Sequence, residues 1–168
     1  MSRMTAMAAC VLAGAGALLG GCQPPGPMTG AAYLEAAKKI VTEIPPEEAA
    51  GELARKSDLF LLDVSEFGEY EEAHIKGAIL IPRGYLEFKI ARNDLYPSIN
   101  RGRVPKKDRP ILLYCTLGSR SALAARTLGE MGYADVRTIK GGLKAWMEAG
   151  LPVEKRLRPT GPATGPAK

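Results

Sequence analysis

Four short runs of the chain are apolar at mostly consecutive positions. They cover residues 59–64, 78–81, 111–114 and 136–139. A strand with one solvated face alternates apolar and polar residues, whereas a strand covered on both faces is apolar nearly throughout. The pattern therefore predicts four buried strands.

Helical patterns stand before and between these runs. A short helix is predicted over 31–40, and a second one follows the turn at 44–48, where Pro46 suits a first helical turn. Apolar residues at helical spacing cover 121–131, with Gly132 as a C-terminal stop, and a last helix over 143–149 follows two glycines. Strands that alternate with helices predict an α/β sandwich built on a parallel sheet.

The N-terminus has the pattern of an export signal. A single charged residue, Arg3, precedes an apolar run over 6–19, which is too short to span a bilayer permanently. The run ends in Leu-Gly-Gly-Cys at 19–22 and resembles the bacterial lipoprotein signal, which implies cleavage before Cys22 and acylation of that cysteine. An ordinary cleaved signal with an incidental cysteine is the alternative. Gln23 after the cysteine slightly favours the outer membrane, so we expect a lipid-anchored protein of the cell envelope that faces the periplasm.

The remaining sequence divides into one domain with polar ends. We expect a signal peptide over 1–21, a flexible tether over 22–32, one folded domain over 33–157 and a disordered tail over 158–168. A chain of 168 residues with three cysteines is long enough for a sizeable core and has too few cysteines for a disulfide scaffold. Its 23 Lys and Arg against 18 Asp and Glu are a mild excess, and we expect no nucleic-acid partner.

The basic excess is concentrated in residues 83–109, which hold eight Lys and Arg against three Asp and Glu. The simpler interpretation is a solvated, irregular connection. The functional interpretation is an electropositive rim that draws anions to the carboxyl edge of the sheet, where open α/β sheets place their sites.

Cys115 is the candidate reactive residue. It is the one thiol left after the signal is removed and Cys22 is acylated, and it stands at the end of a predicted strand, before a short loop and a helix. Such a loop turns backbone N–H groups toward the sulfur, and Gly118 permits the turn. Arg120 adds a cation, and the hydroxyls of Thr116, Ser119 and Ser121 can donate further hydrogen bonds.

The sizes of these interactions indicate that backbone N–H groups contribute most of the stabilisation of a Cys115 thiolate. A free cysteine, with a pKa near 8.5, is only a few per cent thiolate at neutral pH. Lowering that pKa by about two units requires about 2.7 kcal/mol of preferential stabilisation of the thiolate. A helix end contributes about 0.3–2 kcal/mol. Charge-assisted hydrogen bonds from loop amides, at about 1.5–3 kcal/mol each, can supply the rest.

Several segments, in this order, resemble a single-domain rhodanese, a sulfurtransferase. They are LLDVSEFGEYEEAHIKGA (61–78), IPRG (81–84), YCTLGSRSALAARTLGEMGY (114–133) and GGLKAWMEAGLPV (141–153). The resemblance implies a three-layer sandwich with a five-stranded parallel sheet. It also implies that Cys115 carries sulfur and that the loop Thr116, Leu117, Gly118, Ser119, Arg120, together with Ser121, binds substrate. The implied reaction needs no cofactor. Cys115 takes sulfur from thiosulfate or another small anionic donor, held by Arg120 and the basic segment, and a thiol or cyanide receives it.

Three other residues receive supporting roles. Asp63, at the end of a predicted strand, is either structural or supports the loop from behind, and Arg83 is expected beside the site. His74, the single histidine, is interpreted as a packing residue, and we expect no metal site because one histidine offers no ligand set.

Three alternatives are weighed against the sulfurtransferase. Phosphatases and arsenate reductases of the related fold have, by resemblance, five residues between cysteine and arginine, whereas four separate Cys115 from Arg120. A non-catalytic binding or sulfur-relay module is the main alternative. A thiol-redox protein is disfavoured because no second cysteine stands nearby to resolve a disulfide.

Overall fold

The computed structural model describes residues 27–91 and 104–155. The expected signal peptide, residues 22–26 of the expected tether, which include Cys22, and the tail over 158–168 lie outside these ranges. Within the described residues, none of the helices combines the length and the apolar character that crossing a membrane requires.

The sheet has five parallel strands in the order β1-β5-β4-β2-β3. The strands are β1 (Thr42–Ile44), β2 (Phe60–Asp63), β3 (Ile79–Leu80), β4 (Ile111–Tyr114) and β5 (Val136–Ile139). All carboxyl ends of a parallel sheet lie at one edge, so the segments that follow β2, β4 and β5 meet there.

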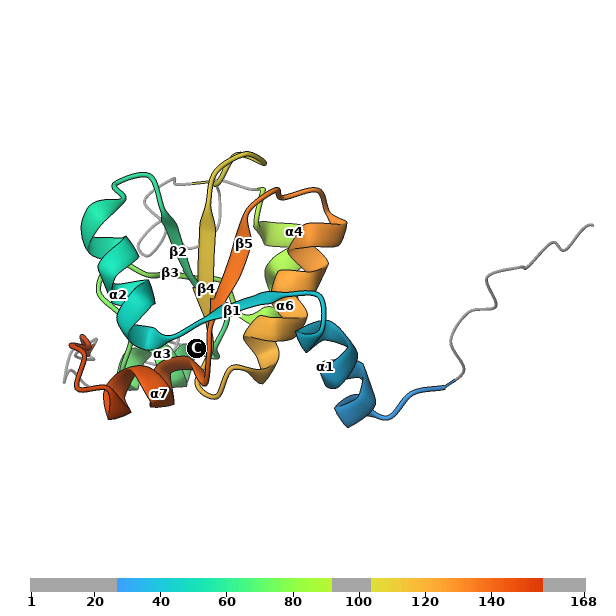
Figure 1. Ribbon diagram of the computed structural model, residues 1–168, viewed down its shortest axis with the longest axis horizontal. Helices are drawn as coiled ribbons and strands as arrows, with labels where there is room; N and C mark the ends of the chain where they lie inside the picture. The colour runs from blue at the N-terminus through green and yellow to red at the C-terminus, as the bar shows by residue number, and fades with distance from the viewer. Residues whose placement is uncertain (1–26, 92–103, 156–168) are drawn as a thin grey trace, which may run out of the picture.

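Helices cover both faces of this sheet, which makes a three-layer sandwich (Figure 1). One layer contains α1 (Gly30–Lys38), α4 (Leu86–Lys89) and α6 (Ser119–Glu130). The other contains α2 (Pro46–Arg55), α3 (Phe67–Glu72) and α7 (Gly142–Glu148).

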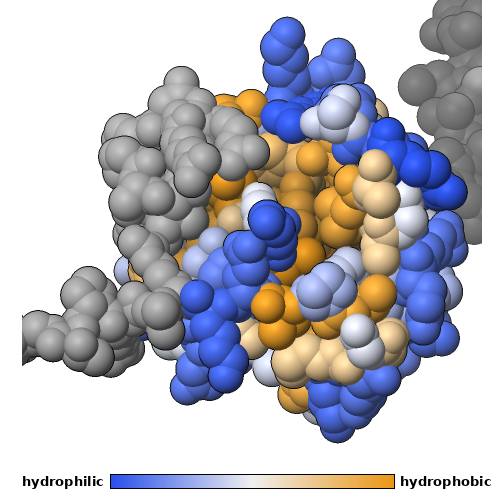
Figure 2. All heavy atoms as spheres, turned by 90° about the vertical axis from the view of Figure 1, so that its left-hand side faces the viewer, coloured by the Kyte–Doolittle hydropathy of each residue, from blue (hydrophilic) through white to orange (hydrophobic). Residues whose placement is uncertain are grey.

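The central strand β4 supplies both cores. Ile111 and Leu113 belong to the hydrophobic cluster under α6, while Leu112 and Tyr114 belong to the cluster under α2 and α7. All four residues are completely buried, which explains why β4 is apolar at every position. Figure 2 faces the side of α2 and α7 and shows apolar side chains bordered by hydrophilic ones.

The four predicted strands are confirmed, and two of them are shorter than predicted. β4 and β5 have the predicted bounds, whereas β2 and β3 are shorter than the predicted 59–64 and 78–81. β1 is a three-residue edge strand that the apolar pattern did not predict, because only its last residue is buried. The five-stranded sheet that the resemblance implied is confirmed.

The interpretation of 83–109 as an irregular connection is wrong at its beginning. Residues Arg83–Tyr85 form a 3₁₀ turn that leads directly into α4. Leu86 and Ile90, four residues apart on one helical face, are both buried against the core below α6. Residues 92–103 lie outside the described part of the chain.

His74 is a packing residue, as predicted, and Trp146 is one as well. The His74 ring stacks on Tyr70 with 3.9 Å between ring centroids, and its Nδ1 lies 2.8 Å from the Tyr70 carbonyl oxygen. Trp146 is buried in the cluster below α7, and its indole N–H donates to the Pro152 carbonyl at 3.0 Å. Neither side chain is available for chemistry at the carboxyl edge of the sheet.

Candidate functional site

Cys115 follows β4 directly and starts a tight loop that ends at the first turn of α6. Its side chain is completely buried, and the backbone N–H of Gly118 donates to Sγ at 3.1 Å. Gly118 has φ +90°, a conformation that glycine adopts without strain and other residues rarely do. An N–H group aimed at the sulfur stabilises negative charge that develops on it during a reaction.

The first turn of α7 fixes the other side of this loop. The N–H of Leu143 donates to the Cys115 carbonyl at 2.8 Å, and the N–H of Lys144 donates to the Thr116 carbonyl at 3.0 Å. The approach is so close that a Cβ at Gly142 would lie 2.2 Å from the Cys115 carbonyl oxygen. The helix therefore holds the loop carbonyls away from the sulfur.

Arg120 enters the site already paired with a carboxylate. Its Nη1 donates to Glu69 Oε2 at 2.7 Å and its Nη2 donates to Glu69 Oε1 at 2.6 Å, a two-pronged ion pair between α6 and α3. These hydrogen bonds hold the pKa of Glu69 down at about 2. The pKa of Arg120 is raised, first by Glu69 and further by the nearby Cys115. The pair therefore stays ionised throughout the physiological range.

The hydroxyl groups of Thr116 and Ser121 donate to partners other than the sulfur, contrary to the expectation from the sequence. Thr116 Oγ1 donates to Glu69 Oε1 at 2.5 Å. Ser121 Oγ is buried, donates to the Gly118 carbonyl at 2.9 Å and accepts a hydrogen bond from Thr138 at 2.7 Å. Both hydroxyls are used to hold the loop, because a buried loop needs partners for its own polar groups.

The remaining loop residues differ in exposure. Leu117 is 63% exposed at the tip of the loop, whereas Ser119, the first residue of α6, is half-buried. Leu117 is thus the part of the loop most open to an incoming molecule.

Asp63 lies behind the site. It ends β2, beside Tyr114 in the sheet register, and its Oδ1 accepts the N–H of Ser65 at 2.8 Å. Burial raises the pKa of Asp63. The carboxyl group is completely buried, so its position is that of a structural residue of the strand end.

Arg83 does not direct its charge to the loop. Its guanidinium donates to Glu87 at 2.7 Å and to Thr127 Oγ1 at 3.0 Å. Thr127 lies about two helical turns beyond Arg120 on α6. The structure therefore brings together Cys115, the loop and Arg120, and leaves Arg83 at the flank of α6.

Sequence reasoning missed Glu69 and the role of Gly142. Glu69 was part of an acidic stretch with no sign of its partner, since Arg120 lies 51 residues further along the chain. The two glycines at 141 and 142 were interpreted only as the start of a helix. A pair of glycines one residue after a strand does signal a close backbone approach, and that signal could have pointed to the loop.

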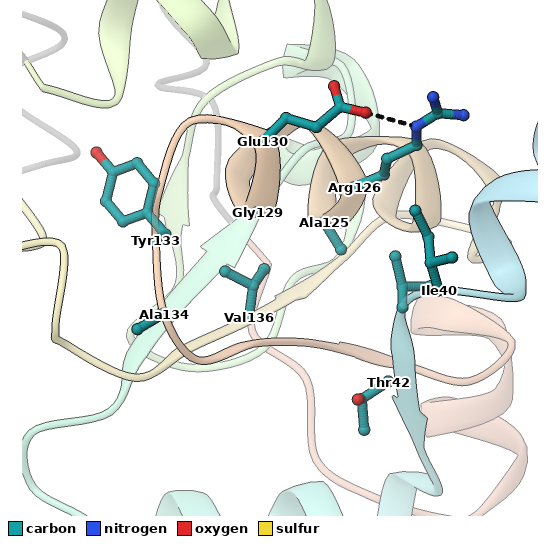
Figure 3. A pocket seen from close by; sticks show the side chains of 10 residues that line it. Ile40, Thr42, Ala125, Arg126, Gly129, Glu130, Tyr133, Ala134 and Val136 are labelled. Carbon is teal, nitrogen blue, oxygen red and sulfur yellow. Dashed lines mark hydrogen bonds and ion pairs between the residues drawn. The ribbon is translucent and has the colours of Figure 1, made fainter. Parts of the chain in front are cut away.

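No cluster of three or more His, Cys, Asp or Glu side chains suited to a metal ion occurs among residues 27–91 and 104–155. A pocket of about 450 Å³ does lie near α6, lined by residues that include Ile40, Thr42, Ala125 and Tyr133. Figure 3 shows Arg126 and Glu130 ion-paired at its border, at 2.8 Å. Because none of its lining residues belongs to the Cys115 loop, this pocket is separate from the candidate site.

Comparison with known proteins gives one consistent family. The family model described as a rhodanese-like domain matches residues 45–149. A sulfurtransferase of Allochromatium vinosum is 30% identical over 114 residues, which cover 68% of this chain and 95% of that protein. A thiosulfate sulfurtransferase, GlpE, of Coxiella burnetii is 31% identical over 97 residues, covering 58% of this chain and 79% of that protein.

A solved structure from Rhodopseudomonas palustris has a similar fold. It is 31% identical, with a TM-score of 0.63, and the match covers 79% of this chain and all of that one. That protein is described as one of unknown function and a possible tyrosine phosphatase. By the resemblance given above, phosphatases of the related fold have five residues between cysteine and arginine, whereas four separate Cys115 from Arg120.

Proposed function

Because the chain belongs to the rhodanese-like sulfurtransferase family, we propose that it transfers sulfane sulfur as a persulfide on Cys115. The donor is thiosulfate or a similar small anion, and the acceptor is a thiol or cyanide. The observation that carries this proposal is the Gly118 N–H aimed at Cys115 Sγ at the carboxyl end of the central strand.

The proposed reaction has two displacement steps at sulfur. In the first, the Cys115 thiolate attacks the outer sulfur of thiosulfate. A new S–S bond forms, the bond to the sulfonate sulfur breaks and sulfite leaves with the electron pair. In the second, cyanide or a thiolate attacks the outer sulfur of the persulfide, and Cys115 leaves as the thiolate. Charge balances in both steps, and no oxidant or cofactor is consumed.

The buried position of Cys115 favours a carrier over a redox thiol. The outer sulfur of a persulfide stands about 2 Å beyond Sγ, which is the length of an S–S bond. The transferable atom is therefore presented ahead of the buried Sγ. Cys115 is the single cysteine among the described residues, so a disulfide mechanism has no second thiol there.

Mass spectrometry of the intact protein tests this proposal. After incubation with thiosulfate and removal of the excess, the protein should gain the mass of one sulfur atom and lose it again on addition of cyanide. Cys115→Ser, which keeps the shape of the side chain, should gain nothing. Gain by both proteins, or by neither with any sulfane donor, contradicts the proposal, and the latter result favours a non-catalytic binding or relay module.

We further propose that the protein is held at the cell envelope by lipid on Cys22 and faces the periplasm. The support is the apolar run at 6–19 and the Leu-Gly-Gly-Cys sequence that ends it. In that compartment the donor and acceptor are small molecules or partner thiols of the envelope, and the family gives no reason to expect nucleic acid.

A further inference from the structure

The sequence predicts that Arg120 binds an anionic donor. In the structure, its guanidinium is already paired with a carboxylate of the protein. Both terminal nitrogens of its guanidinium donate to the two oxygens of Glu69, at 2.6 and 2.7 Å. The same carboxylate also accepts the hydroxyl of Thr116 and the backbone N–H of Glu66 at 2.8 Å. Glu69 is therefore fixed beside the loop by four hydrogen bonds.

A second carboxylate, that of Glu66, adds negative charge near Arg120. Glu66 Oε1 lies 3.8 Å from Arg120 Nη1, and the Glu66 side chain is 62% exposed. The ion pairs at the loop thus combine one positive with two negative groups, a local balance of minus one before Cys115 ionises. The Arg120 and Glu69 side chains, at 31% and 35% exposure, are partly shielded from water, so their charges act on a bound donor with less screening than free ions.

We infer that Glu69 sets the donor class of the site, and that it favours sulfane donors with at most one negative charge over dianions such as thiosulfate. This inference rests on the proposed sulfur transfer. Thiosulfate brings two negative charges to a thiolate, and with Glu69 in place Arg120 compensates little of that charge. A singly charged or neutral donor meets less repulsion. Leu117, exposed at the loop tip, offers an apolar contact to the organic group that such a donor carries.

Two donors of the same chemistry isolate the effect of charge. Thiosulfate is a dianion and methanethiosulfonate is a monoanion. Both deliver their outer sulfur to a thiolate, and sulfite or methanesulfinate leaves. Their intrinsic reactivities differ, so the informative quantity is the change in the ratio of their kcat/KM values for loading Cys115 between wild type and a variant.

Glu69→Gln should shift this ratio about tenfold toward thiosulfate, the size expected for one unit charge acting on one additional donor charge at a partly shielded site. Added salt should shrink the shift, because it screens partly exposed charges. Loosening of the loop alone would slow both donors together and leave the ratio and its salt dependence unmoved. Glu130→Gln is the matched control, since it also removes a carboxylate from an Arg–Glu pair but lies at the far end of α6, and it should leave the ratio unchanged.

An unchanged ratio in Glu69→Gln, with sulfur loading still measurable, would overturn the inference and leave the sulfur transfer intact. Failure of wild type to load from either donor would instead contradict the transfer itself. If Glu69→Gln does not fold, Glu66→Gln removes the other carboxylate without breaking the two-pronged pair. It should shift the ratio in the same direction by a smaller factor, and no shift there would also overturn the inference.

Discussion

The backbone carbonyls of the loop around Cys115 are hydrogen-bonded to other groups, and the Gly118 N–H donates to the sulfur. The carbonyls of Cys115 and Thr116 accept from α7, and the Gly118 carbonyl accepts from Ser121. With these groups fixed before any donor arrives, charge that develops on sulfur requires little rearrangement of the loop. The site is therefore built from backbone geometry more than from reactive side chains.

Gly142→Ala tests this geometry at the position with the least space. Its Cβ would lie 2.2 Å from the Cys115 carbonyl oxygen and 2.7 Å from the Gly118 nitrogen, at φ +66°. We expect a loss of about 2–4 kcal/mol in unfolding free energy, from overpacking and left-handed backbone strain. Sulfur loading at Cys115 should fall by more than the unfolded fraction explains. Urea unfolding and loading measured by mass provide the two readings.

Gly129→Ala is the control for that substitution. Gly129 is exposed inside α6, and a Cβ there would meet nothing within 4 Å. Alanine should stabilise the helix by about 0.5–1 kcal/mol and leave loading unchanged. Equal loading by both alanine variants would mean that α7 does not position the loop.

At the scale of elements, the sequence predicted those parts of the fold that carry a periodic signal. β4 was predicted at its true bounds because consecutive apolar residues are distinctive of a strand covered on both faces. β5 was also predicted at its true bounds, although Arg137 and Thr138 interrupt its apolar pattern. β1 and α3 were missed by this pattern. β1 buries only Ile44 of its three residues, and α3 buries only Tyr70 of its six, so neither has an apolar period to detect.

The candidate site was likewise predictable only where its residues lie close together in the sequence. The order strand, cysteine, glycine, helix placed Cys115 and Arg120 together from local sequence alone. Glu69 could not be placed, because its pairing with Arg120 depends on where α3 packs against α6, a tertiary contact without a local signal. The hydroxyl of Ser121 was assigned to the sulfur although it bonds within the loop, since sequence shows a donor and not its direction.

The end of β2 gives a pH dependence that Asp63→Asn should remove. Burial raises the pKa of Asp63 above its ordinary value of 3.8, so folding favours the protonated carboxyl. Its stabilising contribution is complete below about pH 3.8 and is lost as pH rises through the higher folded-state pKa. Asparagine keeps the oxygen that accepts the Ser65 N–H and does not ionise. The variant should therefore gain stability relative to wild type as pH rises, measured by urea unfolding across pH.

Asp58→Asn serves as the control for Asp63→Asn, because Asp58 is an exposed residue that precedes the same strand. It should change the unfolding free energy by no more than about 0.5 kcal/mol. The difference in unfolding free energy between wild type and Asp63→Asn should change with pH in this direction. A difference that stays constant with pH, or in which the advantage of the variant grows on acidification, would contradict the raised pKa of Asp63.

At the scale of the whole molecule, the residues proposed for sulfur transfer and the cysteine proposed for membrane anchoring lie in separate parts of the chain. The residues that build the site lie between Asp63 and Lys144, inside the span matched by the family model. The proposed anchor, Cys22, precedes that span and lies outside the described residues. Because no residue is shared between the two parts, the anchor can be removed without changing the loop around Cys115.

Cys22→Ser should release the protein from the membrane and leave its sulfur chemistry intact. Acyl chains on Cys22 contribute about 0.8 kcal/mol for each buried methylene, so the lipidated protein enters a detergent phase. Expressed as the full chain in a bacterium, wild type should therefore partition with detergent and the variant with water, while both load sulfur on Cys115 at the same rate. Cys10→Ser is the matched control: Cys10 lies before the expected cleavage point and leaves with the signal, so this variant should partition like wild type. Retention of Cys22→Ser in the detergent phase would mean that something other than lipid on this cysteine holds the protein, and an unlipidated wild-type mass would favour an ordinary cleaved signal.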